Sequence, residues 1–227
     1  MVYPLSGSVS ERVARTRQTI PASVRLIAVT KQVPVEAMRE AYEAGIRDFG
    51  ESRVQEAEGK QAQLQDLPDI TWHLIGHLQA NKAQKALQLF HWIHSVDNLK
   101  LAQRLDRLAE PFTQKPIICL QVKIRPDPAK YGWMAPELLA DLAALNEYHH
   151  LAIQGLMMIP PLGLNAAQLL DAFQQTHTLA TQIRDQNWSH IHIHELSMGM
   201  SEDYELAVQA GATMVRLGRI LFGDRTL

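Results

Sequence analysis

Arg25-Leu-Ile-Ala-Val-Thr-Lys31 is the first of eight short apolar runs, and together these runs decide the fold. The other seven span residues 48–50, 71–76, 91–96, 116–124, 151–159, 192–197 and 213–218. Most of them are almost continuously apolar and do not alternate between apolar and polar residues. That pattern is typical of parallel strands whose two faces are both covered.

Longer amphipathic segments separate the runs. Residues 35–45 have apolar side chains at helical spacing and stop at a glycine, and similar features occur at 136–146, 166–185 and 201–211. Eight strands that alternate with helices predict an α/β fold, a closed (β/α)8 barrel of the TIM type. An open, doubly wound sheet is the alternative that this pattern leaves.

No segment rich in proline, glycine or serine divides the chain, so we expect a single domain over residues 1–227. Within it, residues 1–24 supply one extra helix, at 8–19, and residues 25–225 form the barrel.

Composition narrows the class of protein. The 22 basic and 24 acidic residues give a formal net charge of −2, without the basic excess of a non-specific nucleic-acid binder. Cys119 is the only cysteine, which excludes a disulfide framework within the chain. Neither a membrane-spanning run nor a signal peptide is evident. We therefore expect a soluble cytoplasmic protein that binds neither nucleic acid nor membranes.

Two cationic side chains stand where barrel strands end, and the active face of such barrels lies there. Lys31 is either a lysine emerging into solvent or an amine in a partly dry pocket, where its neutral form condenses with an aldehyde or ketone. Arg216 lies within the last run, and its guanidinium needs an acceptor because it cannot lose its charge. Closure of the barrel would pair the first and last strands and bring both residues into one pocket. A structural ion pair of Arg216 within the barrel is the alternative.

The turn Ser197-Met-Gly-Met-Ser201 follows the seventh run and has a glycine at its centre. Barrels often bind phosphate with the loops after strands seven and eight, and Gly218-Arg219 ends the eighth run. We interpret the two segments as a phosphate seat, with Ser201 as a simple helix N-cap as the alternative. A reactive lysine, a buried arginine and a phosphate seat together describe a pocket for pyridoxal 5′-phosphate (PLP).

The ten histidines raise the question of a metal site. No cysteine cluster or His-Glu-x-x-His pattern accompanies them, so we expect no metal and interpret most of them as satisfied strand or loop residues. His77, after the third run, is kept as a pocket residue. Ser52 lies on the same rim after the second run, and Met157-Met158 is expected to pack against something flat.

Several longer motifs recur, in the same order, in one known family. They are Ala28-Val-Thr-Lys-Gln-Val-Pro34, Asp48-Phe-Gly-Glu-Ser-Arg-Val-Gln-Glu56, Trp72-His-Leu-Ile-Gly-His-Leu-Gln-Ala-Asn-Lys82, His94-Ser-Val-Asp97, Gly155-Leu-Met157, Leu196-Ser-Met-Gly-Met-Ser-Glu-Asp203 and Met214-Val-Arg-Leu-Gly-Arg219 with Phe222-Gly223. Over nearly all of residues 25–225 the chain resembles the PLP homeostasis proteins, the YggS/PROSC (PLPBP) family, and its cyanobacterial PipY-like members.

The resemblance implies the fold-type III barrel of the alanine racemase N-terminal domain, with PLP as the cofactor. The residues it assigns are Lys31 (Schiff base), Arg216 (pyridine nitrogen), Ser201, Gly218, Arg219, Ser197, Gly199 and Met200 (phosphate seat), and His77, Ser52 and Met158 (pocket wall). The family usually has asparagine at position 52 and a smaller or hydroxyl residue at position 158. Ser52 and Met158 therefore depart from its pattern.

An arginine at the ring nitrogen keeps the pyridine unprotonated, which weakens the ring as an electron sink. Racemases with this arrangement add a second base, typically a tyrosine from a further C-terminal domain of a partner subunit. This chain ends at Leu227, and none of its five tyrosines lies at the end of a predicted strand. We therefore predict a carrier in place of an enzyme.

The predicted carrier is a monomer in vitamin B6 and amino-acid/keto-acid homeostasis that passes PLP to apo PLP-dependent enzymes. A weak amino-acid racemase or lyase with Lys31 as its base is one alternative. A Schiff-base aldolase acting on sugar phosphates is the other.

Overall fold

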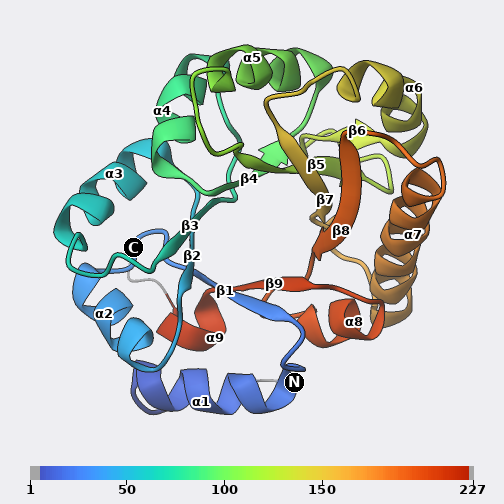
Figure 1. Ribbon diagram of the computed structural model, residues 1–227. Helices are drawn as coiled ribbons and strands as arrows, with labels where there is room; N and C mark the ends of the chain where they lie inside the picture. Colours follow the sequence, from blue (N-terminus) through green and yellow to red (C-terminus); the bar gives the residue numbers. More distant parts are fainter. Residues whose placement is uncertain (1–5, 225–227) are drawn as a thin grey trace.

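The computed structural model describes residues 6–224, which form a closed barrel of parallel strands ringed by helices (Figure 1). The barrel strands are β1 (Arg25–Val29), β2 (Asp48–Glu51), β3 (Thr71–Leu74), β4 (Trp92–Val96), β5 (Ile117–Lys123), β7 (Ala152–Met158), β8 (Ile191–Ser197) and β9 (Met214–Leu217). Each strand pairs with the next along the chain, and the pairing of β1 with β9 closes the ring. The predicted (β/α)8 barrel is confirmed, and the open sheet is excluded.

The helices lie outside the strands and cover them. They are α1 (Val9–Thr19), α2 (Val35–Glu43), α3 (Val54–Gln63), α4 (Ala83–Leu89), α5 (Leu99–Ala109), α6 (Ala135–Leu145), α7 (Ala166–Arg184), α8 (Tyr204–Gln209) and α9 (Arg219–Phe222), with a 3-10 turn at Ala80–Lys82. None of the described helices is long and apolar enough to span a membrane.

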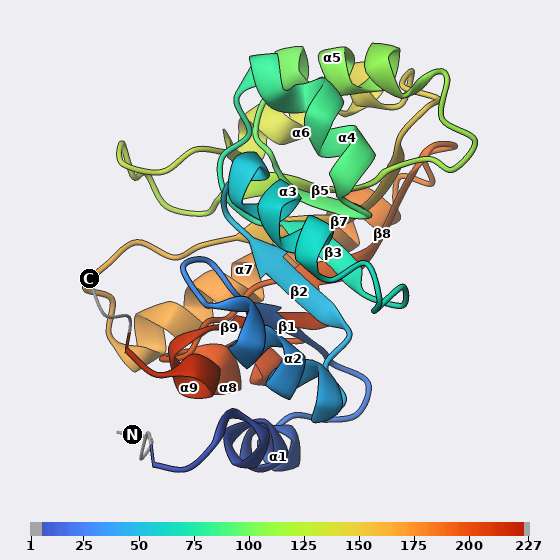
Figure 2. The ribbon, with the colours of Figure 1, turned by 90° about the vertical axis from the view of Figure 1, so that its left-hand side faces the viewer.

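The predicted extra helix before the first strand is present as α1, beside α2 and α9 (Figure 2). Its first turn is closed by a capping box, in which Ser8 accepts from the Glu11 amide and the Glu11 side chain accepts from the Ser8 amide. Arg12 Nε donates to the Leu221 carbonyl at 2.6 Å, which fastens α1 to α9.

Two local features differ from the prediction. A two-residue strand, β6 (Trp133–Met134), pairs with the end of β5, although residues this few carry no periodic signal. The helix expected to open at Ser201 begins at Tyr204 with Asp203 as its N-cap, because residues 201–203 form a turn.

The apolar core has two parts. A large cluster fills the space between strands and helices, and a small cluster packs inside the barrel with Ile27, Trp92, Cys119, Met157 and Met214. The barrel interior is therefore a packed core, as in other barrels of this class. A functional site is expected at the carboxyl ends of the strands. Burial raises the pKa of the Cys119 thiol, so this cysteine remains an inert, protonated core residue.

Candidate functional site

Lys31 lies in a tight turn directly after β1. The Val33 amide donates to the Thr30 carbonyl at 2.9 Å, so Lys31 and Gln32 are the two central residues of the turn. Gln32 has a φ of 60°, in the left-handed region that a non-glycine residue enters at a cost. The half-buried Lys31 is thus held at the carboxyl end of the barrel, on the face where it was predicted.

Arg216 is buried in β9 and lies opposite Ile27 of β1. Its guanidinium donates to the Ser197 carbonyl at 2.5 Å, to Ser197 Oγ at 2.7 Å and to the Met158 carbonyl at 2.9 Å. All three acceptors are neutral oxygens, in contrast to the structural ion pair that the sequence left open. Burial lowers the pKa of Arg216 to about 10, so the group remains a charged donor at neutral pH.

A buried chain of hydrogen bonds starts at Arg216 and crosses the barrel. Ser197 Oγ lies 2.8 Å from His94 Nδ1, His94 Nε2 lies 2.9 Å from His73 Nδ1, and His73 Nε2 lies 3.0 Å from Asp48 Oδ1. Ser197, His94 and His73 have no exposed surface. These contacts belong to the barrel core; no group of three or more metal-binding side chains occurs among the described residues.

The two end residues of this series of hydrogen bonds determine which atom donates the proton in each bond. Arg216 can only donate, so Ser197 accepts from it and gives its own proton to His94 Nδ1. Ionised Asp48 can only accept, so His73 donates from Nε2 and accepts at Nδ1 from His94. Each ring therefore carries one proton, on Nε2. Neutral rings agree with the effect of burial, which lowers the pKa of both histidines.

Acidification is expected to destabilise the protein through these two histidines. The unfolded chain takes up their protons near the ordinary histidine pKa of 6.5, and the folded chain only at lower pH. Stability is therefore complete above pH 6.5 and falls below it, by at most about 1.4 kcal/mol per pH unit for each ring.

Urea unfolding at several pH values between 7.5 and 5.5 measures this slope in the wild type and in His94→Gln. In His94→Gln, the free energy of unfolding should fall less steeply with decreasing pH, by up to about 1.4 kcal/mol per pH unit, the contribution of one histidine. Contributions of buried carboxyls, such as Glu51 and Asp203, cancel in the comparison. Equal slopes in the two proteins would show that His94 titrates normally in the folded state.

The loops after β2, β3 and β4 meet at the same end of the barrel. His77 Nδ1 lies 3.0 Å from Asp97 Oδ2, and the His77 ring stacks on Tyr131 with 3.7 Å between centroids. A Cβ added to Gly76 would lie 2.2 Å from the Ser52 carbonyl oxygen, so these two loops touch. The structure therefore places Ser52 beside Gly76, the residue before His77, at the end of the barrel where the sequence predicted both Ser52 and His77.

Asp97 and Tyr131 in this group were not anticipated. Asp97 is the last residue of the motif His94-Ser-Val-Asp97 and directly follows a predicted strand. That position at the carboxyl end of a strand could have indicated a site residue. Tyr131 lies in the loop between β5 and the unpredicted strand β6, so it reaches this group from a loop and not from the end of a predicted strand.

Gly76→Ala is expected to destabilise the fold by about 1–3 kcal/mol, because the new methyl group must push two loop backbones apart. Gly59→Ala is the matched control: no atom lies within 4 Å of its added Cβ, and alanine favours the interior of α3. Urea unfolding of both variants tests the contact. A Gly76→Ala protein as stable as the control would mean that the loops do not need this approach.

The two predicted phosphate-seat segments lie side by side. The Arg216 amide donates to the Gly199 carbonyl at 3.0 Å, and Ser201 Oγ accepts from the Ile220 amide at 3.4 Å. Gly199 has a φ of 94°, and a Cβ there would lie 2.7 Å from Ala207 Cβ, so this position needs glycine. Gly218 is the N-cap of α9 and faces the same junction.

Some predicted site residues make contacts other than those expected. Ser197 points into the barrel, toward Arg216 and His94, and the Met200 amide already donates to Asp203 Oδ1 at 2.6 Å. The Arg219 side chain is 58% exposed and pairs with Glu202 at 2.6 Å. The Met158 carbonyl accepts a hydrogen bond from Arg216, whereas the Met158 side chain packs in the large cluster between strands and helices.

Several known proteins are similar to this chain in sequence or in fold. The family model of the alanine racemase N-terminal domain matches residues 6–226. The chain is 52% identical to a pyridoxal phosphate homeostasis protein of Synechocystis sp., over 91% of this chain and 94% of that protein. It is also similar to the structure of PipY of Synechococcus elongatus PCC7942 with PLP bound, with a TM-score of 0.90 and 52% identity over 95% of this chain and 100% of PipY. An alanine racemase of Clostridium difficile 630 has a TM-score of 0.74 at 13% identity, over 96% of this chain and 56% of the racemase, which shows the shared fold.

The closed barrel and the match of the family model over residues 6–226 place the chain in the alanine racemase N-terminal class of (β/α)8 proteins. Within that class, the chain belongs to the family of pyridoxal phosphate homeostasis proteins.

Proposed function

We propose that this protein binds PLP at the carboxyl end of its barrel and serves as a PLP carrier in vitamin B6 and amino-acid/keto-acid homeostasis. Support comes from PipY, a protein of 52% identity whose structure has been solved with PLP bound. The observation that carries the proposal in this chain is the fixed position of Arg216, whose guanidinium is held by three hydrogen bonds beside the strand that leads to Lys31.

The donor set fits the chemical groups of PLP. When bound, PLP supplies an aldehyde that condenses with a primary amine and releases water, and Lys31 is the amine at this face. Its pyridine nitrogen accepts one hydrogen bond, which Arg216 can donate. Its phosphate needs N–H and O–H donors, which the junction of Ser201 with residues 218–220 can provide. Arg219 then contributes through its backbone, since its side chain pairs with Glu202.

Ser197 and Met158 act in this proposal by holding Arg216, and His77 with Ser52 forms the wall. A charged arginine never accepts a proton from the ring and never gives one up at neutral pH. It therefore favours retention of the cofactor over carbanion chemistry. We assign the role to a monomer in the cytoplasm.

Transfer of the cofactor tests the carrier function. Protein loaded with PLP and freed of excess ligand is mixed with an apo PLP-dependent enzyme, and the recovery of that enzyme's activity is followed. Recovery should match the amount of PLP that leaves the carrier. A loaded protein that keeps its PLP while the apo-enzyme stays inactive would rule out a carrier.

One observation favours a second candidate, a weak amino-acid racemase or lyase. Tyr131 stacks on His77, which in turn contacts Asp97, so a tyrosine side chain lies at this end of the barrel. Deuterium incorporation at Cα, measured over a panel of amino acids, tests this candidate. Incorporation that disappears in Tyr131→Phe would support an enzyme, and no incorporation by the wild type would exclude it.

A further inference from the structure

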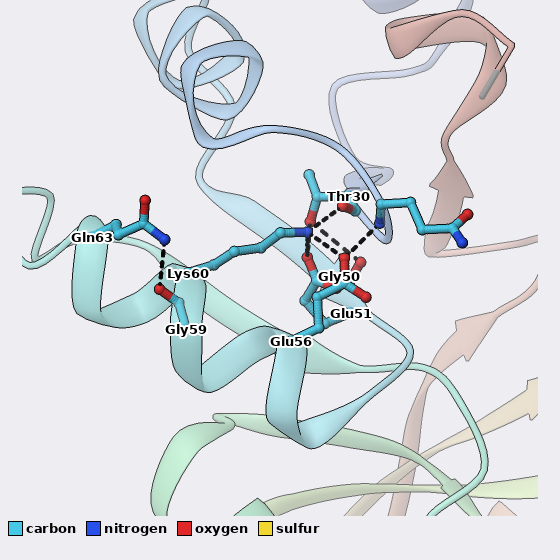
Figure 3. A network of polar contacts seen from close by, with 8 residues as sticks. Thr30, Gly50, Glu51, Glu56, Gly59, Lys60 and Gln63 are labelled. Atoms are coloured by element: carbon cyan, nitrogen blue, oxygen red, sulfur yellow. Dashed lines mark hydrogen bonds and ion pairs between the residues drawn. The ribbon is translucent and has the colours of Figure 1, made fainter. Parts of the chain in front are cut away.

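A buried lysine in α3 joins three elements around the Lys31 turn. Lys60 is 7% exposed, and its ammonium group donates to the Thr30 carbonyl at 2.5 Å, to Glu51 Oε1 at 2.8 Å and to Glu56 Oε1 at 2.7 Å (Figure 3). Three acceptors satisfy all three protons of an ammonium group. Lysine is almost never buried to this degree unless it is paired in this way.

Both neighbours of Lys31 are fixed by this cluster. On one side, the Thr30 carbonyl accepts from Lys60, and Thr30 Oγ1 donates to Glu51 Oε1 at 2.6 Å. On the other side, the Gln32 amide donates to Glu56 Oε1 at 2.5 Å. Because Gln32 is in the left-handed region, this bond holds a backbone conformation that would otherwise be costly. The turn is therefore held at residues 30 and 32, and Lys31 lies between them.

The cluster of Lys60, Glu51 and Glu56 is not an efficient way to raise the free energy of unfolding. Glu51 is completely buried, and its Oε2 atom has no hydrogen-bond partner in the structure. Buried ion pairs can often be replaced by apolar residues without loss of stability, because removing charges from water costs as much as their attraction returns. What the charges do provide is directional contact with the backbone on both sides of one residue.

We propose that Lys60, with Glu51 and Glu56, is a positioning group that orders the turn around Lys31 before the cofactor arrives. Lys60 acts through the backbone of Thr30 and, by way of Glu56, through Gln32. A turn that is already ordered presents the Lys31 amine in a fixed direction, so less order is lost when PLP binds. The effect on PLP rests on the proposed function, whereas the order of the turn does not.

The test uses two variants and one control. Lys60→Met keeps the length and volume of the side chain but removes the ammonium group. Glu56→Leu removes the acceptor of the Gln32 amide and one of the three acceptors of Lys60. It leaves the bonds of Lys60 to Glu51 and to the Thr30 carbonyl in place, so the variant tests the proposal even if Lys60→Met fails to fold. Lys85→Met is the control, since Lys85 pairs with Glu58 on exposed helix surfaces. Thermal unfolding and circular dichroism establish which variants fold.

Hydrogen exchange without PLP is the first measurement. The amides of Gln32 and Val33 should exchange roughly ten to a hundred times faster in Lys60→Met and Glu56→Leu than in the wild type, the effect of losing a hydrogen bond to a charged group. Lys85→Met should match the wild type, and Glu56→Gln, whose side-chain oxygen still accepts, should be close to it. Wild-type exchange in folded Lys60→Met and Glu56→Leu would overturn the proposal.

The second measurement is the rate at which added PLP is incorporated, followed by visible absorbance. Both Lys60→Met and Glu56→Leu should incorporate PLP at least several-fold more slowly than Lys85→Met. Fast exchange combined with an unchanged incorporation rate would overturn the positioning role. A wild type that takes up no PLP would refute the proposed function and this role together, and exchange would still decide whether the cluster orders the turn.

Discussion

Lys31→Ala is expected to abolish covalent attachment of PLP and to leave the barrel folded. The Lys31 side chain lies beyond the end of β1 and outside both core clusters, so its removal leaves no cavity in the apolar core. The Thr30–Val33 hydrogen bond and the contacts of Lys60 with Thr30 do not involve the Lys31 side chain and should persist. The change in stability should thus stay within about 1 kcal/mol. The protein mass after PLP addition and borohydride reduction measures the attachment.

Lys100→Ala is the matched control, because Lys100 is an exposed lysine of α5. It should gain the same mass as the wild type, and Lys31→Ala should gain none. If Lys31→Ala still gained one pyridoxyl group, another lysine would be the site of attachment, and the assignment of the turn would be wrong.

Arg216→Met is expected to have the largest effect on stability. It leaves the Met158 carbonyl and both oxygens of Ser197 without their donor inside the barrel. Each unsatisfied buried group costs about 1–3 kcal/mol, partly offset because the buried charge is also removed, so we expect a net loss of about 3–5 kcal/mol. The dissociation constant for PLP should rise at least about tenfold, the loss of one hydrogen bond from a charged group.

Two comparisons make this result interpretable. Arg39→Met removes an exposed pair with Asp66 and should leave both stability and PLP binding nearly unchanged. Affinity is measured by equilibrium titration at a temperature where Arg216→Met is folded. Wild-type PLP affinity in folded Arg216→Met would mean that the guanidinium does not contact the cofactor.

The fold could be predicted because parallel strands leave a strong local signal. A strand covered on both faces must be apolar at successive positions, and the eight runs show this directly in the sequence. Strand ends then follow, which is why Lys31 and Arg216 could be placed on one face. The extra helix at α1 was predictable for the same local reason, since its periodicity and its serine cap both lie within a few residues.

Side-chain partners were harder to predict because they are distant in the sequence. His94 and Ser197 are separated by 103 positions, and nothing local to either indicates the other. Lys60 is surrounded in sequence by glycine and glutamine and resembles a solvated lysine; only the folded chain places it under the Lys31 turn. The loop that carries Tyr131 is fixed by β6, which is too short to leave a pattern.

The phosphate-seat residues show an intermediate case. Gly199 was predicted as part of a phosphate seat, and that role stays a prediction. The structure adds a backbone reason for glycine there, its positive φ and its close packing. The direction of the Ser197 side chain could not be predicted, because its partners Arg216 and His94 are distant in the sequence. In the structure it points into the barrel, toward both of them. Asp203 takes the cap position that Ser201 was expected to fill.

The most direct test of the central claim is the visible absorbance spectrum of the wild-type protein with PLP, recorded before and after borohydride reduction and followed by peptide mass mapping. We predict a yellow protein that bleaches on reduction, with one pyridoxyl group fixed on the peptide that contains Lys31. A protein that stays colourless with added PLP, or a pyridoxyl group on any other lysine, would contradict the assignment of this turn as the PLP site.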